Sequence, residues 1–367
     1  MERRHGRTGN KNLSQAVNPN FWVGKRVMLT GHTGFKGSWI SLWLGVMGAN
    51  LRGLSLPAAY EPCLFDVARV SQFIQTRFID IRDFQAVKAE MIAFQPEILI
   101  HLAAQPLVRF SYQDPLGTYT TNIIGTINIL EAARVTDSIK VIVNVTSDKC
   151  YENDGSWHSF TEAEPMGGDD PYSSSKGCSE IISRAYRTSF LTNRGINLAT
   201  ARAGNVIGGG DWSTDRLVPD VLRSLVTEEP LVIRNPAHVR PWQHVLEPIS
   251  GYLLLAEKLY LEGSNYAEGW NFGPGKDSEK SVGWVAEFLL NASGNNPSWS
   301  VEEECQLAEA TCLKLDSSKA NNRLNWQPRW CIATALSLTL DWHNKWVARG
   351  DMQKECLNQI LFYEENQ

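Results

Sequence analysis

The feature that most constrains the fold is a glycine-rich turn between a short strand and a helix near the start of the chain. A β-rich run, Lys25 to Thr30, leads into Gly31-His-Thr-Gly-Phe-Lys-Gly37. Residues 38–47 then carry apolar and aromatic side chains at helical spacing, and a second strand is predicted over 49–56. Strand, glycine turn, helix and strand within about thirty residues form the βαβ unit that opens dinucleotide-binding folds.

Strands and helices continue to alternate beyond this unit. The predicted elements are a strand near 76–79, a helix over 83–94, a strand over 97–102, a helix over 117–135, a strand over 140–145, a helix beginning near Pro171 and a strand over 197–201. The strands are nearly continuous in Val, Ile and Leu, as expected when helices cover both faces of a sheet. We therefore predict an α/β fold with a Rossmann-type, doubly wound parallel sheet.

The pattern loosens after about residue 205, where Pro, Trp and charged residues become more frequent. We expect a smaller C-terminal α/β lobe there that binds the substrate. The predicted division is a flexible N-terminal extension over 1–18, a dinucleotide-binding Rossmann domain over 19–204 with a return segment at about 246–272, and a substrate lobe formed by 205–245 and 273–367.

Composition argues against several classes of partner. The 367 residues include 35 Lys and Arg and 40 Asp and Glu, which gives a formal net charge of −5. This mild acidity provides no bulk attraction to nucleic acid or to an anionic membrane. The seven cysteines are scattered without a CxxC pair, which argues against a zinc module and a disulfide framework. The same cysteine pattern suits a reducing cytosol, and no stretch is long and apolar enough for a membrane span, so we expect a cytoplasmic protein. We also expect no metal site.

The glycine turn predicts how a dinucleotide would bind. Gly31 allows the tight turn, Gly34 lets the backbone approach the pyrophosphate, and Gly37 lets the helix pack closely on the strand. The phosphates would lie on free N–H groups at the helix N-terminus. The end of the second strand, Arg52-Gly-Leu-Ser-Leu56, lacks the acid that usually holds the adenosine ribose. Either Ser55 or a backbone group replaces it, or the site prefers a ribose 2′-phosphate.

A tyrosine and a lysine lie four residues apart in Asp170-Pro-Tyr-Ser-Ser-Ser-Lys176. Pro171 suits the first position of a helix capped by Asp170, so Tyr172 and Lys176 share one helix face. An ammonium group beside a phenol favours the phenolate and lowers the pKa of the tyrosine. Such a tyrosine can remove a proton from a sugar hydroxyl while hydride leaves the same carbon for nicotinamide. The alternative is a solvated helix in which the pair is incidental.

The predicted strand over 141–145 ends at Thr146-Ser-Asp-Lys149. Ligands of such sheets gather at the carboxyl ends of the strands. We therefore predict that Ser147 shares the substrate hydroxyl with Tyr172, and that Asp148 and Lys149 add an acid and an amine beside it. A polar turn after a buried strand is the alternative. The accompanying glycine turn and Tyr–Lys pair argue against it for Ser147 and Asp148, whereas it stays open for Lys149.

Seven segments occur in the order found in extended short-chain dehydrogenase/reductases, the NAD-dependent sugar-nucleotide epimerase/dehydratase family. They are TGHTGFKG (30–37), HLAAQP (101–106), TSDKCY (146–151), YSSSK (172–176), ARAGNVIGGGDW (201–212), RPWQHV (240–245) and WNFGP (270–274). The resemblance covers about residues 19–346, and the first, third and sixth segments narrow it to the CDP-glucose 4,6-dehydratases. The resemblance implies NAD as the cofactor. Members of this subfamily resemble other NAD users of the family, although the carboxylate that usually holds the ribose is missing.

The resemblance implies a lyase that converts CDP-glucose to CDP-4-dehydro-6-deoxyglucose and water, for deoxysugar biosynthesis. Tyr172 would deprotonate the glucose 4-hydroxyl as the C4 hydride passes to NAD+, water would leave across C5 and C6, and the hydride would return to C6. Asp148 is placed to protonate the leaving 6-hydroxyl. Most related dehydratases have Glu after this Asp to abstract the C5 proton, whereas this chain has Lys149. We hypothesise that Lys149 is a desolvated base or an enolate stabiliser.

The resemblance also implies which residues surround the ligands. The catalytic group is Ser147, Asp148, Lys149, Tyr172 and Lys176. The cofactor would contact Gly31, Thr33, Gly34, Phe35, Lys36, Gly37, Asp80, Ile81, Leu102, Ala103, Ala104, Tyr172 and Lys176. The substrate would contact Gln105, Asn205, Arg216, Leu217, Arg240, Trp242 and His244. A diphosphate on a mildly acidic protein needs arginine forks and amide donors, which Asn205, Arg216 and Arg240 supply.

For some of these residues a purely structural role is an alternative to a ligand contact. Asp80 at the end of the third strand is nearly as well explained as a carboxylate in a strand-end turn. Trp242 and His244 are at least equally well explained as a packed aromatic residue and a satisfied histidine.

Other functions stay open at this stage. A sugar-nucleotide 4-epimerase or reductase on the same fold would need neither Asp148 nor any acid for a 6-hydroxyl, and a dehydratase could act on another nucleotide-glucose. A regulator with an inactive site would have no need of Ser147, Tyr172 and Lys176. By resemblance, the helices over 117–135 and 172–190 would form the seam of a homodimer or a dimer of dimers, although their apolar stripes could equally face the sheet.

Overall fold

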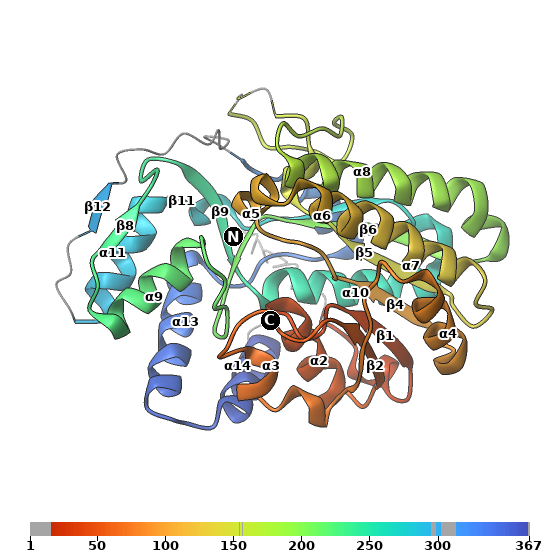
Figure 1. Ribbon diagram of the computed structural model, residues 1–367, viewed down its shortest axis with the longest axis horizontal. Coiled ribbons are helices and arrows are strands. Elements are labelled where there is room, and N and C mark those ends of the chain that lie inside the picture. Colours follow the sequence, from red (N-terminus) through yellow and green to blue (C-terminus); the bar gives the residue numbers. More distant parts are fainter. Residues whose placement is uncertain (1–15, 154, 156, 295–298, 302–312, 366–367) are drawn as a thin grey trace, which may run out of the picture.

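A computed structural model describes residues 16–153, 155, 157–294, 299–301 and 313–365, which form two lobes (Figure 1). The larger lobe holds a seven-stranded sheet of order β10-β6-β5-β4-β1-β2-β3, in which every neighbouring pair is parallel. Its strands are β1 (Arg26–Thr30), β2 (Asn50–Ser55), β3 (Gln75–Phe78), β4 (Ile98–His101), β5 (Val141–Val145), β6 (Asn197–Ala203) and β10 (Gly269–Phe272). The predicted Rossmann-type parallel sheet is confirmed.

Helices cover both faces of this sheet, which explains its apolar strands. One face packs against α2 (Phe35–Val46) and α10 (Leu246–Glu262). The other packs against α4 (Phe84–Phe94), α7 (Gly125–Arg134) and α8 (Pro171–Tyr186), which lie side by side in Figure 1. The interior strand β5 is buried along its whole length, whereas the edge strand β3 is mostly exposed.

Two of the predicted helices contain π-helical turns. The helix predicted over 117–135 consists of α6 (Pro115–Tyr119), a π turn at Thr120–Ile124 and α7. The helix that begins at Pro171 continues past α8 through a π turn at Arg187–Leu191. Three short helices were not predicted, because they are too short to show a helical period. They are α1 (Pro19–Trp22), α3 (Leu64–Val67) and α5 (Val108–Gln113).

The smaller lobe has its own core. Its strands β7 (Asn205–Ile207), β9 (Val239–His244) and β11 (Glu279–Ser281) form one sheet, and β8 (Leu231–Ile233) pairs with β12 (Trp299–Val301) in another. The helices α9 (Leu217–Thr227), α11 (Val282–Ala292) and α13 (Ile332–Val347) enclose this core. By contrast, α12 (Ser318–Leu324) and α14 (Met352–Glu365) pack into the larger lobe. The segment 273–367, assigned to the substrate lobe from the sequence, is therefore shared between the two lobes.

The extension predicted over 1–18 lies outside the described residues as far as residue 15. Beyond that point the chain is anchored. Val17 is buried in the core of the larger lobe. The backbone N–H of Asn18 donates to Glu257 Oε1 at 2.9 Å, and Trp22 Nε1 donates to the same oxygen at 2.8 Å.

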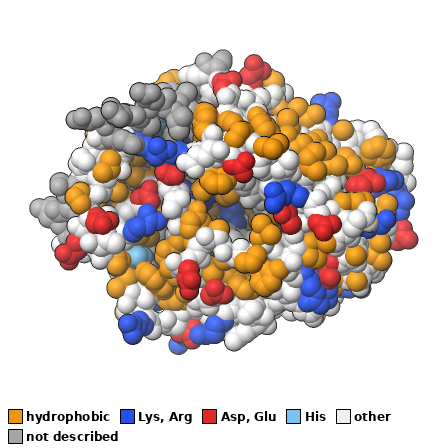
Figure 2. Space-filling view, viewed as in Figure 1, with side chains coloured by type: hydrophobic (Ala, Val, Ile, Leu, Met, Phe, Trp, Pro, Cys, Tyr) orange, Lys and Arg blue, Asp and Glu red, His pale blue; other side chains and the backbone are white. Residues whose placement is uncertain are grey.

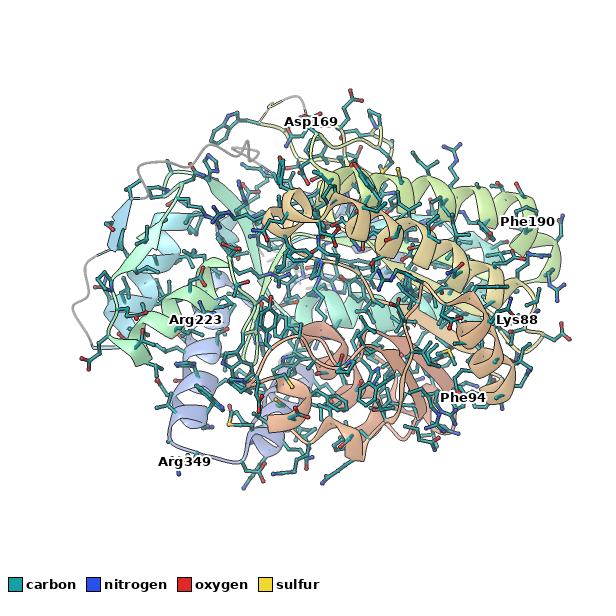
Figure 3. All side chains as sticks on the ribbon, viewed as in Figure 1. Lys88, Phe94, Asp169, Phe190, Arg223 and Arg349 are labelled. Atoms are coloured by element: carbon teal, nitrogen blue, oxygen red, sulfur yellow. The ribbon has the colours of Figure 1, made fainter. Side chains whose placement is uncertain are left out.

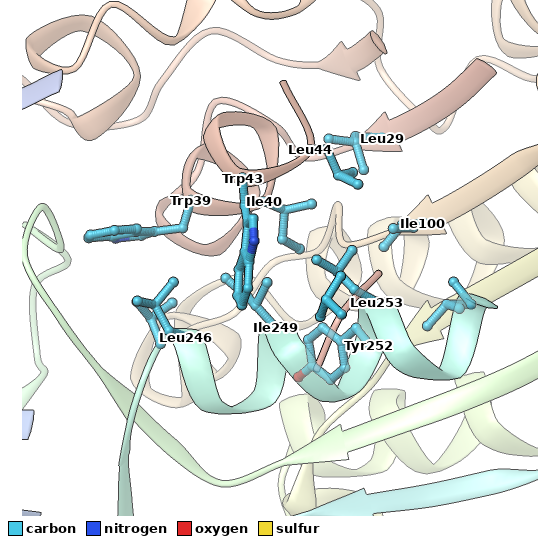
Figure 4. Close-up of a cluster of buried hydrophobic side chains, with 14 of the residues drawn as sticks. Leu29, Trp39, Ile40, Trp43, Leu44, Ile100, Leu246, Ile249, Tyr252 and Leu253 are labelled. Atoms are coloured by element: carbon cyan, nitrogen blue, oxygen red, sulfur yellow. The ribbon is translucent and has the colours of Figure 1, made fainter. Parts of the chain in front are cut away.

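The contact between α2 and α10 anchors the glycine turn to the core (Figure 4). Trp39 and Trp43 of α2 meet Leu246 and Ile249 of α10, and the set is fully buried. Burial of each such large apolar side chain contributes roughly 1.5–3 kcal/mol. The indole N–H of Trp39 also donates to the carbonyl of Gly209 at 3.0 Å, which ties α2 to the smaller lobe. In the described part of the chain, no helix is long and apolar enough to cross a membrane.

Candidate active site

A cavity of about 990 Å³ lies between the lobes, at the carboxyl ends of β1, β4, β5 and β6. Figure 2 shows this face hollowed at its centre, with basic side chains inside the hollow. Asp169, at the upper edge of Figure 3, belongs to the loop before α8 and lines the cavity. Of the residues predicted from the sequence for catalysis, cofactor or substrate, all except His244 line this cavity.

The glycine turn has the geometry that close approach of backbone requires. Gly31 has φ +75°, and a Cβ there would lie 2.8 Å from the backbone N of Ala103. A Cβ on Gly37 would collide with the carbonyl of Gly31, so helix α2 can begin this close to the turn only with glycine. Gly34 precedes the first residue of α2 and is exposed, and no side chain caps the helix. The N–H groups of this helix end are therefore available to an anion.

At the adenosine end of the cavity, hydroxyl groups rather than a carboxylate lie at the end of β2. Thr33 Oγ1 is 2.7 Å from Ser55 Oγ and donates to the carbonyl of Leu56 at 2.9 Å. At the end of β3, Asp80 pairs with Arg82 at 2.6 Å, and this hydrogen-bonded pair lowers the pKa of Asp80. Both charged residues line the cavity, so a ribose phosphate there would compete with Asp80 for the guanidinium group.

Two basic residues of the glycine turn have opposite positions. Lys36 lines the cavity, and burial lowers its pKa to about 8, with further lowering by Arg216 and Lys176. His32 points away beneath β2, where its Nε2 lies 3.0 Å from Thr76 Oγ1 and burial lowers its pKa to about 4. The structure thus places one cation of the turn, Lys36, where a cofactor phosphate or the reacting groups would lie.

The Tyr–Lys pair occupies the start of α8, as predicted. Asp170 caps the helix by accepting a hydrogen bond from Ser173 N at 2.9 Å. Tyr172 and Lys176 are both buried and face the cavity. Burial raises the pKa of Tyr172 to about 12, and its hydrogen bond with Ser147 and the charge of Arg216 act in the opposite direction. Burial lowers the pKa of Lys176 to about 8.

The sequence reasoning expected Lys176 to lower the pKa of Tyr172. In the folded chain, desolvation of the phenol outweighs the neighbouring cations. The tyrosine therefore needs the positive charges around the cavity to become a base.

The segment after β5 places an acid against the tyrosine. Ser147 Oγ donates to Asp148 Oδ1 at 3.0 Å, and the backbone N–H of Lys149 donates to Ser147 Oγ at 3.2 Å. Asp148 is buried, and its second oxygen, Oδ2, has no hydrogen-bond partner among the described residues. Burial raises the pKa of Asp148, although Lys149 partly opposes this. A buried carboxyl with one unpartnered oxygen facing a cavity is suited to carry a proton to a ligand.

Gly204 leaves the space that this carboxyl group needs. A Cβ on Gly204 would lie 3.0 Å from Asp148 Oδ2. Both residues line the cavity, one from each side of the lobe boundary.

The smaller lobe supplies the residues that the sequence predicted for a diphosphate. Asn205 lies on β7, Arg216 immediately precedes α9, and Arg240 and Trp242 lie on β9. Arg216 pairs with Asp211 at 3.0 Å. Trp242 is buried and donates its indole N–H to the carbonyl of Lys280 at 2.9 Å.

Two further predicted substrate contacts come from different lobes. Leu217 begins α9 in the smaller lobe. Gln105 follows β4 in the larger lobe, and its amide N–H donates to Thr118 Oγ1 at 2.8 Å. Leu102, Ala103 and Ala104 complete the wall between Gln105 and the glycine turn.

The prediction that His244 contacts the substrate is wrong. His244 is fully buried outside the cavity, with its ring 4.9 Å from that of Trp330 and 6.1 Å from that of Trp39. Burial lowers its pKa to about 3, so the ring is neutral. His244 follows Arg240 and Trp242 at intervals of two residues along β9, but the strand has by then passed the cavity and entered the packing of the larger lobe.

Two functional candidates were missed by the sequence reasoning. Asp211 lines the cavity and holds Arg216, and its position within the segment 201–212 was the available signal. Arg109 of α5 pairs with Asp215 of the smaller lobe at 3.1 Å and so bridges the cavity mouth. Nothing local to the sequence marks that pair, because its members are 106 residues apart.

Comparison with known proteins defines the class of this chain. The family described as GDP-mannose 4,6 dehydratase matches residues 28–339, and the chain belongs to this family of nucleotide-sugar enzymes. Within it, the chain is 49% identical over 341 residues to the CDP-glucose 4,6-dehydratase of Salmonella typhimurium, covering 92% of this chain and 95% of that protein. It is 26% identical to a dTDP-glucose 4,6-dehydratase of Xanthomonas campestris, covering 86% and 92% of the two chains.

Solved structures share the fold at lower identity. UDP-glucose 4-epimerase of Thermotoga maritima, solved with UDP-glucose, has a TM-score of 0.78 and 22% identity, covering 88% of this chain and 99% of that one. A dTDP-glucose 4,6-dehydratase of Streptomyces venezuelae, solved with NAD, has a TM-score of 0.74 and 23% identity, covering 89% and 99%. These likenesses establish the two-lobed fold.

Proposed function

We propose that the protein is a CDP-glucose 4,6-dehydratase, a lyase that forms CDP-4-dehydro-6-deoxyglucose and water for deoxysugar biosynthesis. The observation that carries the proposal is the buried Asp148, with its unpartnered oxygen, beside Tyr172 and Lys176. A 4-epimerase requires no acid for a 6-hydroxyl, so this carboxyl group favours dehydration. The 49% identity to the Salmonella enzyme supports CDP-glucose as the substrate.

NAD is the cofactor of this proposal. The space left by Gly31 and Gly37 and the uncapped start of α2 fit a pyrophosphate, and the residues that would hold the cofactor line one continuous wall from Gly31 to Ala104. The Thr33 and Ser55 hydroxyls would serve the ribose, and the pairing of Arg82 with Asp80 disfavours a 2′-phosphate. Bound NAD+ would supply the hydride acceptor for C4 and the hydride donor for C6.

The chain's own residues would move the protons. As a phenolate, Tyr172 would accept the proton of the 4-hydroxyl, helped by Ser147, which shares that hydroxyl, and by the charge of Arg216. In the proposal the Lys176 ammonium group also favours the phenolate. The resulting 4-ketone acidifies the C5 proton. Asp148, whose pKa is raised by burial, would give a proton to the 6-hydroxyl, which leaves as water.

Lys149 occupies the position next to this acid and lines the cavity. In the proposal Lys149 would either accept the C5 proton as a neutral amine or, as an ammonium group, stabilise the enolate while another group accepts that proton. A proton would return to C5 when C6 is reduced. Lys149→Ala should slow exchange of the C5 proton with solvent, measured by deuterium incorporation into the product. Exchange at the native rate would remove Lys149 from this role.

The substrate diphosphate would lie in the smaller lobe against Asn205, Arg216 and Arg240. The guanidinium groups supply fixed donor pairs that match phosphate oxygens. Leu217 and Trp242 would shape the adjacent wall, and Gln105 would contact the sugar from the larger lobe.

The test is mass spectrometry of the protein incubated with CDP-glucose and catalytic NAD+, with dTDP-, UDP- and GDP-glucose in parallel. We expect loss of one water from the CDP sugar alone. Water loss from another nucleotide would retain the mechanism and overturn the substrate. An unchanged mass with every sugar would overturn dehydration and favour the epimerase or an inactive site.

We further propose a homodimer, or a dimer of such dimers, in the cytoplasm, acting on a small molecule without nucleic acid or membrane. The outer faces of α6 to α8 expose a set of large apolar side chains that includes Leu116, Ile124 and Ile181. Phe190, at the far end of this layer from the cavity in Figure 3, is also exposed. Large apolar side chains exposed on one layer of helices are consistent with a subunit contact. The five cysteines that the structure describes are free thiols, which suits a reducing compartment.

A further inference from the structure

One buried carboxylate joins the two segments that carry the catalytic candidates. Glu180 lies four residues after Lys176 on α8 and is 5% exposed. Its Oε1 accepts a hydrogen bond from Thr146 Oγ1 at 2.5 Å, and its Oε2 accepts one from Thr200 Oγ1 at 2.6 Å. Thr146 immediately precedes Ser147, so this bond spans from the catalytic helix to the start of the segment 146–151.

Arg202 of β6 completes the arrangement and extends it to the other end of that segment. Its Nε and Nη2 donate to the two oxygens of Glu180 at 2.9 and 2.7 Å, as a bidentate pair. Its Nη1 donates to Tyr151 OH at 2.6 Å, and Tyr151 OH donates to Asn271 Oδ1 at 2.7 Å. Each carboxylate oxygen of Glu180 thus accepts two hydrogen bonds, and every one of these partners is buried.

The energetics of this cluster indicate that it fixes the arrangement of its residues rather than adding to the stability of the fold. A buried ion pair costs desolvation that its attraction only partly offsets, so a core of apolar residues could serve stability equally well. A fully satisfied polar network, however, admits few alternative arrangements. Its members attach to both ends of the segment that contains Ser147, Asp148 and Lys149, and to the helix that contains Tyr172 and Lys176.

We propose that Glu180 is a positioning residue, which with Arg202 clamps the segment 146–151 against α8 and so holds Ser147 and Asp148 in register with Tyr172 and Lys176. The clamp residues are Glu180, Arg202 and Thr146, and of these only Thr146 lines the cavity. The clamp acts on the reacting groups through the backbone and through helix α8. This inference rests on the proposed function for its kinetic test.

The two threonines offer a matched pair of variants. Thr146→Val and Thr200→Val each remove one hydroxyl hydrogen bond to Glu180 without a large change in side-chain shape. Only Thr146 belongs to the segment that carries the acid, whereas Thr200 lies within β6. We expect kcat for CDP-glucose dehydration to fall about ten- to a hundred-fold in Thr146→Val with KM changed less than about threefold, because small misplacements of reacting groups carry losses of this size. Thr200→Val should stay within about threefold of the native kcat.

A second pair of variants replaces a buried carboxyl group by its amide. Glu180→Gln is compared with Glu257→Gln, which changes a buried residue on the other face of the sheet that binds Trp22 and Asn18 and does not line the cavity. Both variants should unfold at lower denaturant concentration, but only Glu180→Gln should lower kcat. Equal kcat values in both pairs, at matched stability, would overturn the clamp and leave Glu180 a structural residue.

A measurement without substrate separates this inference from the proposed function. The groups around the Lys176 amine are Glu180 on its own helix, Cys150 of the turn 148–150, Lys36 of α2 and His101 of β4. Of these four groups, Glu180 and Cys150 raise the pKa of Lys176. Competitive acetylation at a series of pH values, read from the peptide carrying Lys176, should show its pKa lower by about one unit in Glu180→Gln.

The outcomes are distinct. An inactive native protein with the expected shift in the Lys176 pKa would contradict the proposed substrate and keep the link between Glu180 and the Lys176 site. An active native protein in which Glu180→Gln changes neither kcat nor the Lys176 pKa would contradict the clamp. An inactive native protein without the shift would contradict both.

Discussion

At the scale of single residues, burial decides the protonation of the groups at the site. Asp148 holds one carboxyl oxygen without a partner in a buried position, so its neutral form is favoured. Lys36 and Lys176 have their pKa values lowered by burial to about 8. The same desolvation raises the pKa of Tyr172 to about 12, so the cations nearest to it are needed for its role as a base.

Replacement of the acid should separate oxidation from water loss. Asp148→Asn keeps the shape of the side chain but cannot donate a carboxyl proton, so we expect dehydration to fall by about 10²- to 10⁴-fold. Oxidation at C4 should persist, and absorbance at 340 nm should show nicotinamide reduced without release of the deoxysugar. Product formation within a few-fold of the native rate would show that another group protonates the leaving hydroxyl. The assay follows both signals in one stopped-flow experiment.

At the scale of elements, the turn between β1 and α2 combines two different demands on glycine. Gly37→Ala would force a Cβ into the carbonyl of Gly31, so we expect it to lower the unfolding midpoint and to abolish NAD binding. A Cβ on Gly34 would lie 3.4 Å from the same carbonyl, which the fold tolerates more easily. Gly34→Ala should therefore bind NAD at least about tenfold more weakly with a nearly native midpoint. Thermal unfolding and NAD titration of both variants test this contrast, and equal losses of stability would contradict it.

Glu247 of helix α10 makes the stability of the fold depend on pH. Its carboxylate accepts hydrogen bonds from Arg329 N, Trp330 N and Tyr363 OH, and burial raises its pKa to about 7. The folded state therefore holds a proton that the unfolded state has lost above its ordinary pKa near 4.5. Stability from this group is fully present below that value and is lost as the pH rises to about 7, by about 3 kcal/mol in all.

The check is urea denaturation of the native protein and Glu247→Gln between pH 5 and pH 8. The difference between the two proteins isolates this residue from the buried histidines, whose lowered pKa values act in the opposite direction. We expect the native protein to lose more stability than the variant over this range. Parallel pH profiles would show that Glu247 ionises normally in the fold.

At the scale of the whole molecule, the lobes meet around the cavity and an apolar helix layer lies on the side away from it. Ile181 of α8 is 57% exposed, so a charge there costs the monomer little. Ile181→Glu should therefore yield monomers if α6 to α8 form the subunit contact, as measured by light scattering after size-exclusion chromatography. Val347→Glu is the control, because Val347 is 52% exposed on α13 in the other lobe. A native protein that is already monomeric, or a dimer that survives Ile181→Glu, would contradict the proposed seam.

Local patterns were sufficient to predict the parallel sheet, the turn formed by Gly31, Gly34 and Gly37, and the shared helix face of Tyr172 and Lys176. These features depend on chain period, glycine geometry and capping, which act over a few residues. Resemblance, rather than local pattern, extended the site to Asn205 and the other residues of the smaller lobe.

Only the tertiary structure decided the rest. His244 has the strand register of Arg240 and Trp242, yet it packs against tryptophans because β9 has left the cavity by that point. The pairing of Glu180 with Arg202 joins residues that are 22 positions apart, and no periodicity marks it. Burial, which raises the pKa of Asp148, is a property of the assembled lobes. Sequence by itself therefore determined which chemical groups the chain carries and on which elements, whereas long-range packing determined which of them meet and in what charge state.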